Sequence, residues 1–258
     1  MGLADLHIHT DHSHDGTDTV PAVLKRAAEI GLDVIAIADH DDIDGALRAL
    51  DLAPACGVGV VPGCEISTAD GHLVALFIHS RIPPWLTLSE TLRRVADQGG
   101  LCFAAHPGGQ YDYSLSLDLL RRTLRDPELA RILVGVETFN AGLLHLADNW
   151  GAQALARELP VARLGGSDAH ILRSIGTGLT WFPGSSVDDL REALEGHYTE
   201  AVAGRIRPRA VVLAEWGARL ALRYAAGDSH DLHPEAGLNP APPPLPSGGD
   251  VRPPAGHD

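Results

Sequence analysis

Lysine is almost absent from this 258-residue sequence, because Lys25 is its only lysine and the other basic residues are arginines. A mechanism that depends on lysine therefore has one candidate. Basic residues are also outnumbered, with 20 Lys and Arg against 34 Asp and Glu, which gives a formal net charge of −14. Such acidity argues against a general nucleic-acid or anionic-membrane binder. Aromatic residues are only 5% of the chain, so no stacking groove for a long nucleic acid is predicted.

Cysteine is equally sparse. Cys56, Cys64 and Cys102 show no CxxC spacing, which excludes a disulfide framework and a zinc ribbon and predicts buried thiols in a cytoplasmic protein. The first ten residues lack a basic segment followed by an apolar one, so no secretory signal is expected. No run of 18 apolar residues is present, so we expect no membrane span.

Hydrophobic residues make up 45% of the chain, enough for a sizeable core. Short apolar runs alternate with helix-like segments, which predicts parallel strands flanked by helices, in either an open doubly wound sheet or a barrel. Both architectures place functional residues at the carboxyl ends of strands. The expected strands are residues 3–9, 32–38, 59–65, 72–78, 101–105, 133–139, 161–164 and 178–182. The expected helices are residues 19–31, 42–53, 87–99, 116–125, 146–159 and 186–195.

The composition predicts three regions along the chain. Residues 1–205 form the α/β domain, and residues 206–227 form a C-terminal helix that packs on it. Residues 228–258 hold eight of the 18 prolines and no apolar periodicity, which predicts a disordered, acidic tail.

Histidine is abundant, with 14 residues, and several of them follow predicted strands. His7 and His9 lie two apart on one strand, so both rings face the same side. Neutral imidazole is the commonest metal ligand, although an HxH pair alone is a weak signal and is more typical of a half-solvated strand. Other strand ends supply more such side chains: Asp39, His40, Asp41, Asp42, Glu65, His72, His106, Glu137, Asp168 and His170. Imidazoles and carboxylates without thiolates suit Zn²⁺, Mn²⁺ or Fe²⁺, and so many donors predict two or three ions that share a carboxylate.

The chain resembles the PHP (polymerase and histidinol phosphatase) family of metal-dependent phosphoesterases over roughly residues 1–200. The resemblance rests on seven segments in family order: DLHIHTDHSHDG (5–16), GLDVIAIADHDD (31–42), VPGCEIS (61–67), GHLVALFI (71–78), AAHPG (104–108), GVETFNAG (135–142) and GGSDAH (165–170). It implies a distorted (β/α)7 barrel with a trinuclear metal centre at the C-terminal ends of the strands. The chain has Ala38 where many relatives have Thr, which removes a hydroxyl but no ligand.

The resemblance also implies a ligand set. The first ion would be held by the residues that also act catalytically through a metal-activated hydroxide: His7, His9, Glu65 and Asp168. Glu65 would bridge to a second ion, held also by His106 and by His72. A third ion would be held by Asp15, His40 and His170. Glu137 is a further candidate ligand, and His79 competes with His72, which we prefer because Gly71-His72-Leu73 matches the family pattern.

The implied reaction is the hydrolysis of phosphate monoesters or small phosphodiesters. Arg173 could grip a phosphate through its guanidinium or could be an ordinary surface arginine. His12 or His14 could protonate the leaving group or could simply face solvent from a loop. The expected partner is a small phosphorylated substrate, with no membrane, no extended nucleic-acid surface and no obligate protein partner.

Four alternatives stay open on the sequence. The protein could be a nucleotide phosphatase or 3′/5′ nuclease, or a histidinol-phosphatase-like enzyme. It could be a non-catalytic, metal-binding regulatory module, although no expected ligand is missing. It could also be an amidohydrolase-like barrel, which usually has a bridging lysine at a strand end, whereas Lys25 lies in a predicted helix.

Overall fold

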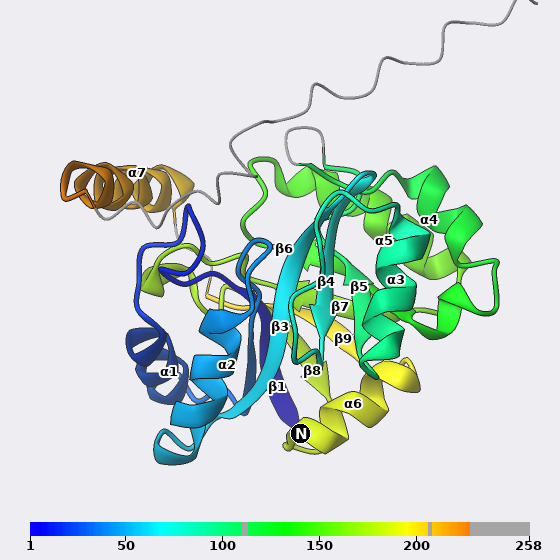
Figure 1. Ribbon diagram of the computed structural model, residues 1–258, viewed down its shortest axis with the longest axis horizontal. Helices are drawn as coiled ribbons and strands as arrows, with labels where there is room; N and C mark the ends of the chain where they lie inside the picture. Colours follow the sequence, from blue (N-terminus) through cyan, green and yellow to red (C-terminus); the bar gives the residue numbers. More distant parts are fainter. Residues whose placement is uncertain (110–112, 206–207, 228–258) are drawn as a thin grey trace, which may run out of the picture.

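The strands form one curled sheet in the computed structural model, which describes residues 1–109, 113–205 and 208–227 (Figure 1). Within these residues the sheet has nine strands in the order β7-β6-β5-β4-β3-β2-β1-β8-β9. The strands are β1 (Gly2–Ile8), β2 (Val34–Ile37), β3 (Gly59–Thr68), β4 (Gly71–Leu76), β5 (Leu101–Ala104), β6 (Leu133–Asn140), β7 (Ala162–Gly166), β8 (Gly178–Phe182) and β9 (Glu200–Ala203).

The helices lie around the outside of this sheet (Figure 1). The apolar faces of the first five helices pack against the sheet in one large core that includes Val23 and Leu24 of the first helix and Leu92 of the third. The helices are α1 (Val20–Glu29), α2 (Asp44–Leu52), α3 (Leu88–Asp97), α4 (Leu117–Thr123), α5 (Asn149–Glu158), α6 (Val187–Glu195) and α7 (Arg209–Ala225).

The strand directions depart from the all-parallel prediction. β1, β2 and β3 are parallel neighbours, and so are β5, β6 and β7, but β4 is antiparallel to both β3 and β5. β8 is antiparallel to β1 and to β9. The short connection between Thr68 and Gly71 explains β4, because so few residues can join only antiparallel strands. β9 was not predicted, since its four residues are mostly exposed and lack a buried apolar pattern.

The barrel is almost closed where β7 meets β8. The Gly165 amide donates to Thr180 Oγ1 at 3.0 Å, and this hydroxyl donates back to the Gly165 carbonyl at 2.9 Å. The strands approach so closely that a Cβ on Gly178 would lie 2.0 Å from the carbonyl oxygen of Gly166. The predicted distorted α/β barrel is therefore confirmed, with a strand count that differs from seven.

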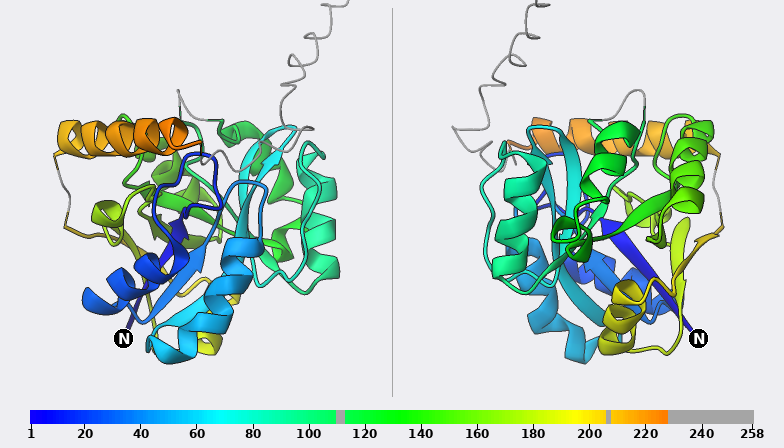
Figure 2. Two further views of the ribbon diagram at one scale, coloured as in Figure 1. Left: turned by 60° about the vertical axis from the view of Figure 1, so that its left-hand side comes forward. Right: turned by 90° about the vertical axis from the view of Figure 1, so that its right-hand side faces the viewer.

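One end of the barrel is filled by apolar side chains. Leu6, Phe103 and Phe182 are buried in a second core inside the barrel, and Leu190 and Leu194 of α6 pack onto it. α6 lies at the same end as the N-terminus (Figure 1). The opposite end, where β1 and β2 finish, is free of this packing, and α7 crosses it (Figure 2).

Asp5 of β1 connects this strand to the segments that follow β7 and precede β8. Its carboxylate is fully buried and accepts the amides of Ser167 at 3.1 Å and Gly176 at 2.8 Å. Burial raises the pKa of Asp5 to about 6 in spite of these hydrogen bonds.

We predict that Asp5→Asn lowers the free energy of unfolding by about 1–3 kcal/mol, because the new amide group would face a backbone N–H that needs an acceptor. Urea denaturation measures the effect, with the exposed Asp188→Asn as a control. Equal stability of both variants would contradict this account of Asp5.

The expected division of the chain can be followed only in part. α7 lies within the predicted 206–227 helix, whereas residues 206–207 and the predicted tail at 228–258 lie outside the described residues. Among the residues that the structure describes, no helix combines the length and the apolar character needed to cross a bilayer.

Candidate metal centre

β1 delivers the first pair of histidines to the open end of the barrel. Ile8, between the two histidines, packs into the core under the helices, whereas His7 and His9 both face Glu65. Both are almost fully buried, with 0% and 1% of their surface exposed, and their rings lie 5.2 Å apart. The HxH pair is thus part of an interior site, not of a half-solvated strand.

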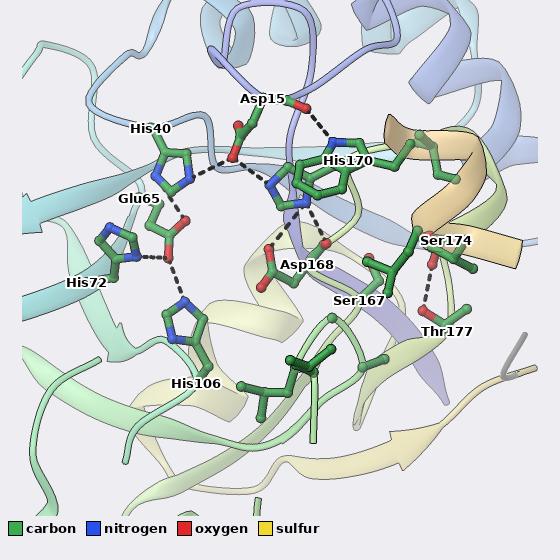
Figure 3. A pocket seen from close by; sticks show the side chains of 18 of the residues that line it. Asp15, His40, Glu65, His72, His106, Ser167, Asp168, His170, Ser174 and Thr177 are labelled. Atoms are coloured by element: carbon green, nitrogen blue, oxygen red, sulfur yellow. Dashed lines mark hydrogen bonds and ion pairs between the residues drawn. The ribbon is translucent and has the colours of Figure 1, made fainter. Parts of the chain in front are cut away.

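Glu65 lies at the centre of a ring of imidazoles (Figure 3). It is 1% exposed and comes from β3, between β2 and β4. Its oxygen atoms lie 3.1–3.3 Å from nitrogen atoms of His7, His9, His40, His72 and His106. The structure thereby places His72, not His79, beside Glu65; His79 is exposed on the surface after β4.

Two further carboxylates extend the cluster. Asp15, from the loop after β1, has Oδ2 3.0 Å from His170 Nε2 and 3.4 Å from His40 Nε2. Asp168, which follows β7, has Oδ1 3.2 Å from His9 Nε2. The result is a continuous row of alternating carboxylates and imidazoles across the barrel end.

The row divides into three groups whose donor atoms lie within 4.8 Å of one another. The groups are His7, His9 and Asp168; His40, Glu65 and His72; and His9, Asp15, His40 and His170. Bonds of about 2.0–2.2 Å put two donors on one ion about 3.0–3.4 Å apart, which is the spacing seen around Glu65 and Asp15. Among the described residues, Nε2 of His7, Nε2 of His9 and Oδ1 of Asp15 are buried without a hydrogen-bond partner. These orphaned donors and their chemistry fit divalent metal ions.

The electrostatics of the cluster favour cation binding. Burial alone would raise the pKa of Glu65 and of Asp168, but facing histidines, His7 first, hold both pKa values well below their usual range. Burial, with help from His170, lowers the pKa of His9 to about 3, so this imidazole is neutral. Burial would also lower the pKa of His40, yet Glu65 and Asp15 raise it to about 10. Ions at this site would therefore displace protons from some of the histidines.

Glu137 contacts two of the candidate ligands, His7 and His106. Its Oε1 lies 3.0 Å from His7 Nδ1, and its Oε2 accepts the His106 amide at 2.8 Å and Asn140 Nδ2 at 2.9 Å. Both oxygens are thus engaged by protein groups, and Glu137 belongs to none of the three donor groups. Glu137 is therefore placed to orient the His7 ring, and its role as a further ligand stays a prediction.

We predict that Glu137→Gln weakens metal affinity about 10–100-fold, which is typical when a partner of a ligating histidine is replaced. The amide would present an N–H₂ group where the carboxylate accepts hydrogen bonds. Titration with a competing chelator measures the affinity, and the exposed Glu192→Gln serves as a control. Unchanged affinity would show that His7 does not need this partner.

The backbone at two candidate ligands is strained. His106 and Asp168 have φ values of 31° and 51°, which are uncommon for residues other than glycine and concentrate at functional sites. Gly166 lets β7 pass behind the cluster, since a Cβ there would lie 2.1 Å from Glu137 Oε1.

Sequence reasoning missed several supporting residues. Ser13 Oγ lies 3.3 Å from His9 Nδ1 and accepts the His40 amide at 3.1 Å, and Ser114 Oγ lies 2.9 Å from His106 Nδ1. Ser13 lies inside the 5–16 motif, which was the available signal for it. Ser114 had none.

The predicted substrate-binding residues are scattered. His14 lines the cavity beside the cluster, with its Nε2 3.8 Å from Asp15 Oδ2, and burial lowers its pKa. His12 lies in the same loop but does not line the cavity. Arg173 lies outside the cavity and pairs with Glu215 of α7 at 2.5 Å, so the structure gives no support to its predicted role as a phosphate grip.

A cavity of about 530 Å³ opens directly onto the donor atoms. Its floor is formed by candidate ligands, among them His40, Glu65 and Asp168, and its mouth by residues after β6 and from α7. This volume suits a small molecule.

Together, the barrel and the cluster define a metal-binding α/β barrel protein with its site at the carboxyl ends of the strands. The family model of the PHP domain matches residues 5–126, and the PHP-associated family model matches residues 147–196. The uncharacterized protein MJ1587 of Methanocaldococcus jannaschii is 35% identical over 170 residues, which are 61% of this chain and 93% of that protein. The chain therefore belongs to the PHP family of metal-dependent phosphoesterases.

Two further relatives extend the comparison. The phosphoribosyl 1,2-cyclic phosphate 1,2-diphosphodiesterase of Eggerthella lenta is 35% identical over 99 residues, which are 36% of this chain and 37% of that enzyme. A crystal structure of a two-domain protein from Bacteroides vulgatus, which contains a predicted PHP-like metal-dependent phosphoesterase, matches with a TM-score of 0.65. Its identity is 20%, over 84% of this chain and 69% of that one, so it supports the fold alone.

Proposed function

We propose that this protein hydrolyses phosphate monoesters or small phosphodiesters at a centre of two or three divalent metal ions. The observation that carries the proposal is the cavity of about 530 Å³ that ends on the three donor groups. A phosphate ester in this cavity would have its phosphorus at the cluster and its organic group toward the mouth. The Eggerthella lenta relative is named a phosphodiesterase, which supports the proposal that the bond cleaved is a phosphate ester bond.

Divalent ions, when bound, lower the pKa of a coordinated water and neutralise the negative charge of the phosphoryl group. The residues of this chain that would hold them are His7, His9, Asp15, His40, Glu65, His72, His106, Asp168 and His170. Glu65 would be shared between ions, because its two oxygens face different histidines. Manganese, zinc and iron all suit imidazole and carboxylate donors.

A residue at the cavity wall would donate a proton to the leaving group. His14 is the candidate, since it lines the cavity with half of its side chain exposed and can exchange protons with solvent. Burial lowers the pKa of His14, and Asp15 beside it opposes this shift in part. The buried walls of β1 and β7 keep bulk water away from the other side of the cluster.

The proposal is tested with metal-stripped protein that is reloaded with Mn²⁺, Zn²⁺ or Fe²⁺. We expect hydrolysis of p-nitrophenyl phosphate or of a nucleotide monoester, and its loss on chelation. His40→Ala should abolish the activity, whereas His79→Ala, which changes an exposed histidine outside the cavity, should retain it. The absence of hydrolysis over a broad panel of phosphate esters with all three metals would overturn the proposal.

A further inference from the structure

α7 crosses the open end of the barrel (Figure 2) and is held there mainly by polar contacts. Trp216 Nε1 donates to the Asp15 carbonyl at 2.8 Å, and Arg219 Nη1 donates to Asp18 at 2.9 Å. Arg223 donates to the main-chain oxygen of Ser13 at 2.8 Å. The helix is thus fastened to the loop that carries Asp15, although none of its residues is fully buried.

Apart from Arg209 at its start, the face of α7 that lines the cavity is apolar. Val212, Leu213 and Trp216 line the cavity, opposite the candidate metal ligands. The Trp216 ring meets the His170 ring edge to face, with 5.6 Å between their centres. Leu143 and Ile171, from the loops after β6 and β7, continue the same apolar surface. A ligand with its anionic end at the cluster would therefore extend along an apolar wall.

Cations are scarce on that wall. Among the described residues lining the cavity, Arg209 is the single lysine or arginine. Its guanidinium donates to the carbonyl oxygens of Leu144 and Ala141, and burial lowers its pKa. Apart from His14 beside the cluster, a substrate with several phosphate or carboxylate groups would find no further basic side chain there. The wall favours a substrate that is anionic at one end and apolar beyond it.

α7 also lies outside the two segments that the PHP family models match, which end at residues 126 and 196. A specificity element on α7 would accordingly belong to this chain in addition to the shared catalytic barrel.

On the basis of the proposed function, we infer that α7 selects the substrate: Val212, Leu213 and Trp216 bind a flat, apolar organic group that is attached to the phosphate. The preferred substrates are then aryl-type phosphate esters, and short polyol phosphates are poor ones. Apolar contacts of this size in a pocket change specificity by about 10–200-fold.

The test uses two doubly substituted proteins with matched chemistry. Val212→Thr/Leu213→Asn makes the wall polar at nearly constant volume. Val211→Thr/Leu222→Asn makes the same changes on the same helix, at exposed positions that do not line the cavity. The measurements are calorimetric affinities for phenylphosphonate and methylphosphonate, metal content, and kcat/KM for phenyl phosphate and glycerol phosphate.

We expect the wall variant to lose about 10-fold or more in affinity for phenylphosphonate and in kcat/KM for phenyl phosphate. Its methylphosphonate affinity, its metal content and its glycerol phosphate hydrolysis should stay within twofold of the unsubstituted protein, and the control variant should match that protein throughout. An equal effect on both phosphonates, or none, with hydrolysis intact would overturn the inference alone. Failure of the metal-loaded, unsubstituted protein to bind either phosphonate or to hydrolyse any ester would overturn the proposed function as well.

Discussion

Glu65→Gln is expected to lower kcat/KM for phosphate ester hydrolysis by more than about 100-fold. Replacing residues that only orient metal ligands already costs about 10–100-fold, and Glu65 lies within 3.3 Å of five imidazoles. The amide keeps the shape of the side chain but loses the negative charge and one acceptor. Two adjacent donor sites would therefore be weakened by one substitution.

Metal content and steady-state kinetics measure this effect together. The variant should bind fewer ions per chain, whereas Glu90→Gln on α3, which removes an exposed carboxylate that pairs with Arg94, should bind as many as the unsubstituted protein. Full metal content and unchanged kcat/KM in the Glu65 variant would show that this carboxylate is not the shared ligand.

Much of this site could be predicted because of where parallel strands end. The apolar stretches around His7 and before His40 and His106 predict buried strands. His7 indeed lies within β1, and β2 and β5 end shortly before His40 and His106. Carboxyl ends of parallel strands meet at one end of a barrel. Most of the row of histidines and carboxylates therefore follows from sequence order alone. His72 is the exception, because it lies at the start of β4 and reaches this end only since that strand is antiparallel to β3.

The remaining features depend on the direction of side chains and on packing over long range. Glu137 has the same strand-end position as Glu65, yet its oxygens turn to His7, His106 and Asn140. Arg173 follows a candidate ligand closely in sequence but pairs with Glu215 of α7, 42 residues away. Nothing local in the sequence reports such pairings. The same holds for Trp216, which contacts the Asp15 loop across 201 residues.

Removal of the metal ions should lower the melting temperature by roughly 5–15 °C. Ligand at 100–1,000 times its dissociation constant stabilises a protein by about 2.7–4.1 kcal/mol, and each kcal/mol shifts the melting temperature of a chain of this size by about 2–4 °C. Calorimetric scans with bound Mn²⁺ and after chelation measure the difference. The Glu65→Gln protein should show a much smaller difference, and an equally large one would contradict the assignment of the site.

The stabilisation by metal should grow as the pH rises from about 6.5 to 9. In the metal-free protein, carboxylates raise the pKa of His40 to about 10 and that of His170 to about 9, from an ordinary value of 6.5. A raised histidine pKa contributes stability in full below the unfolded value, and the contribution is lost as the pH rises toward the folded value. The metal-free protein should therefore become less stable over this range.

Metal binding has the opposite dependence on pH, since ligating histidines must be deprotonated and higher pH favours that form. His9, whose pKa burial lowers to about 3, is already neutral throughout and changes neither trend. Melting curves at pH 6.5 and 8.5, each with and without a chelator, should thus show a larger gap at pH 8.5. A difference in melting temperature that is constant or that narrows with pH would mean that the ions do not displace protons from His40 and His170.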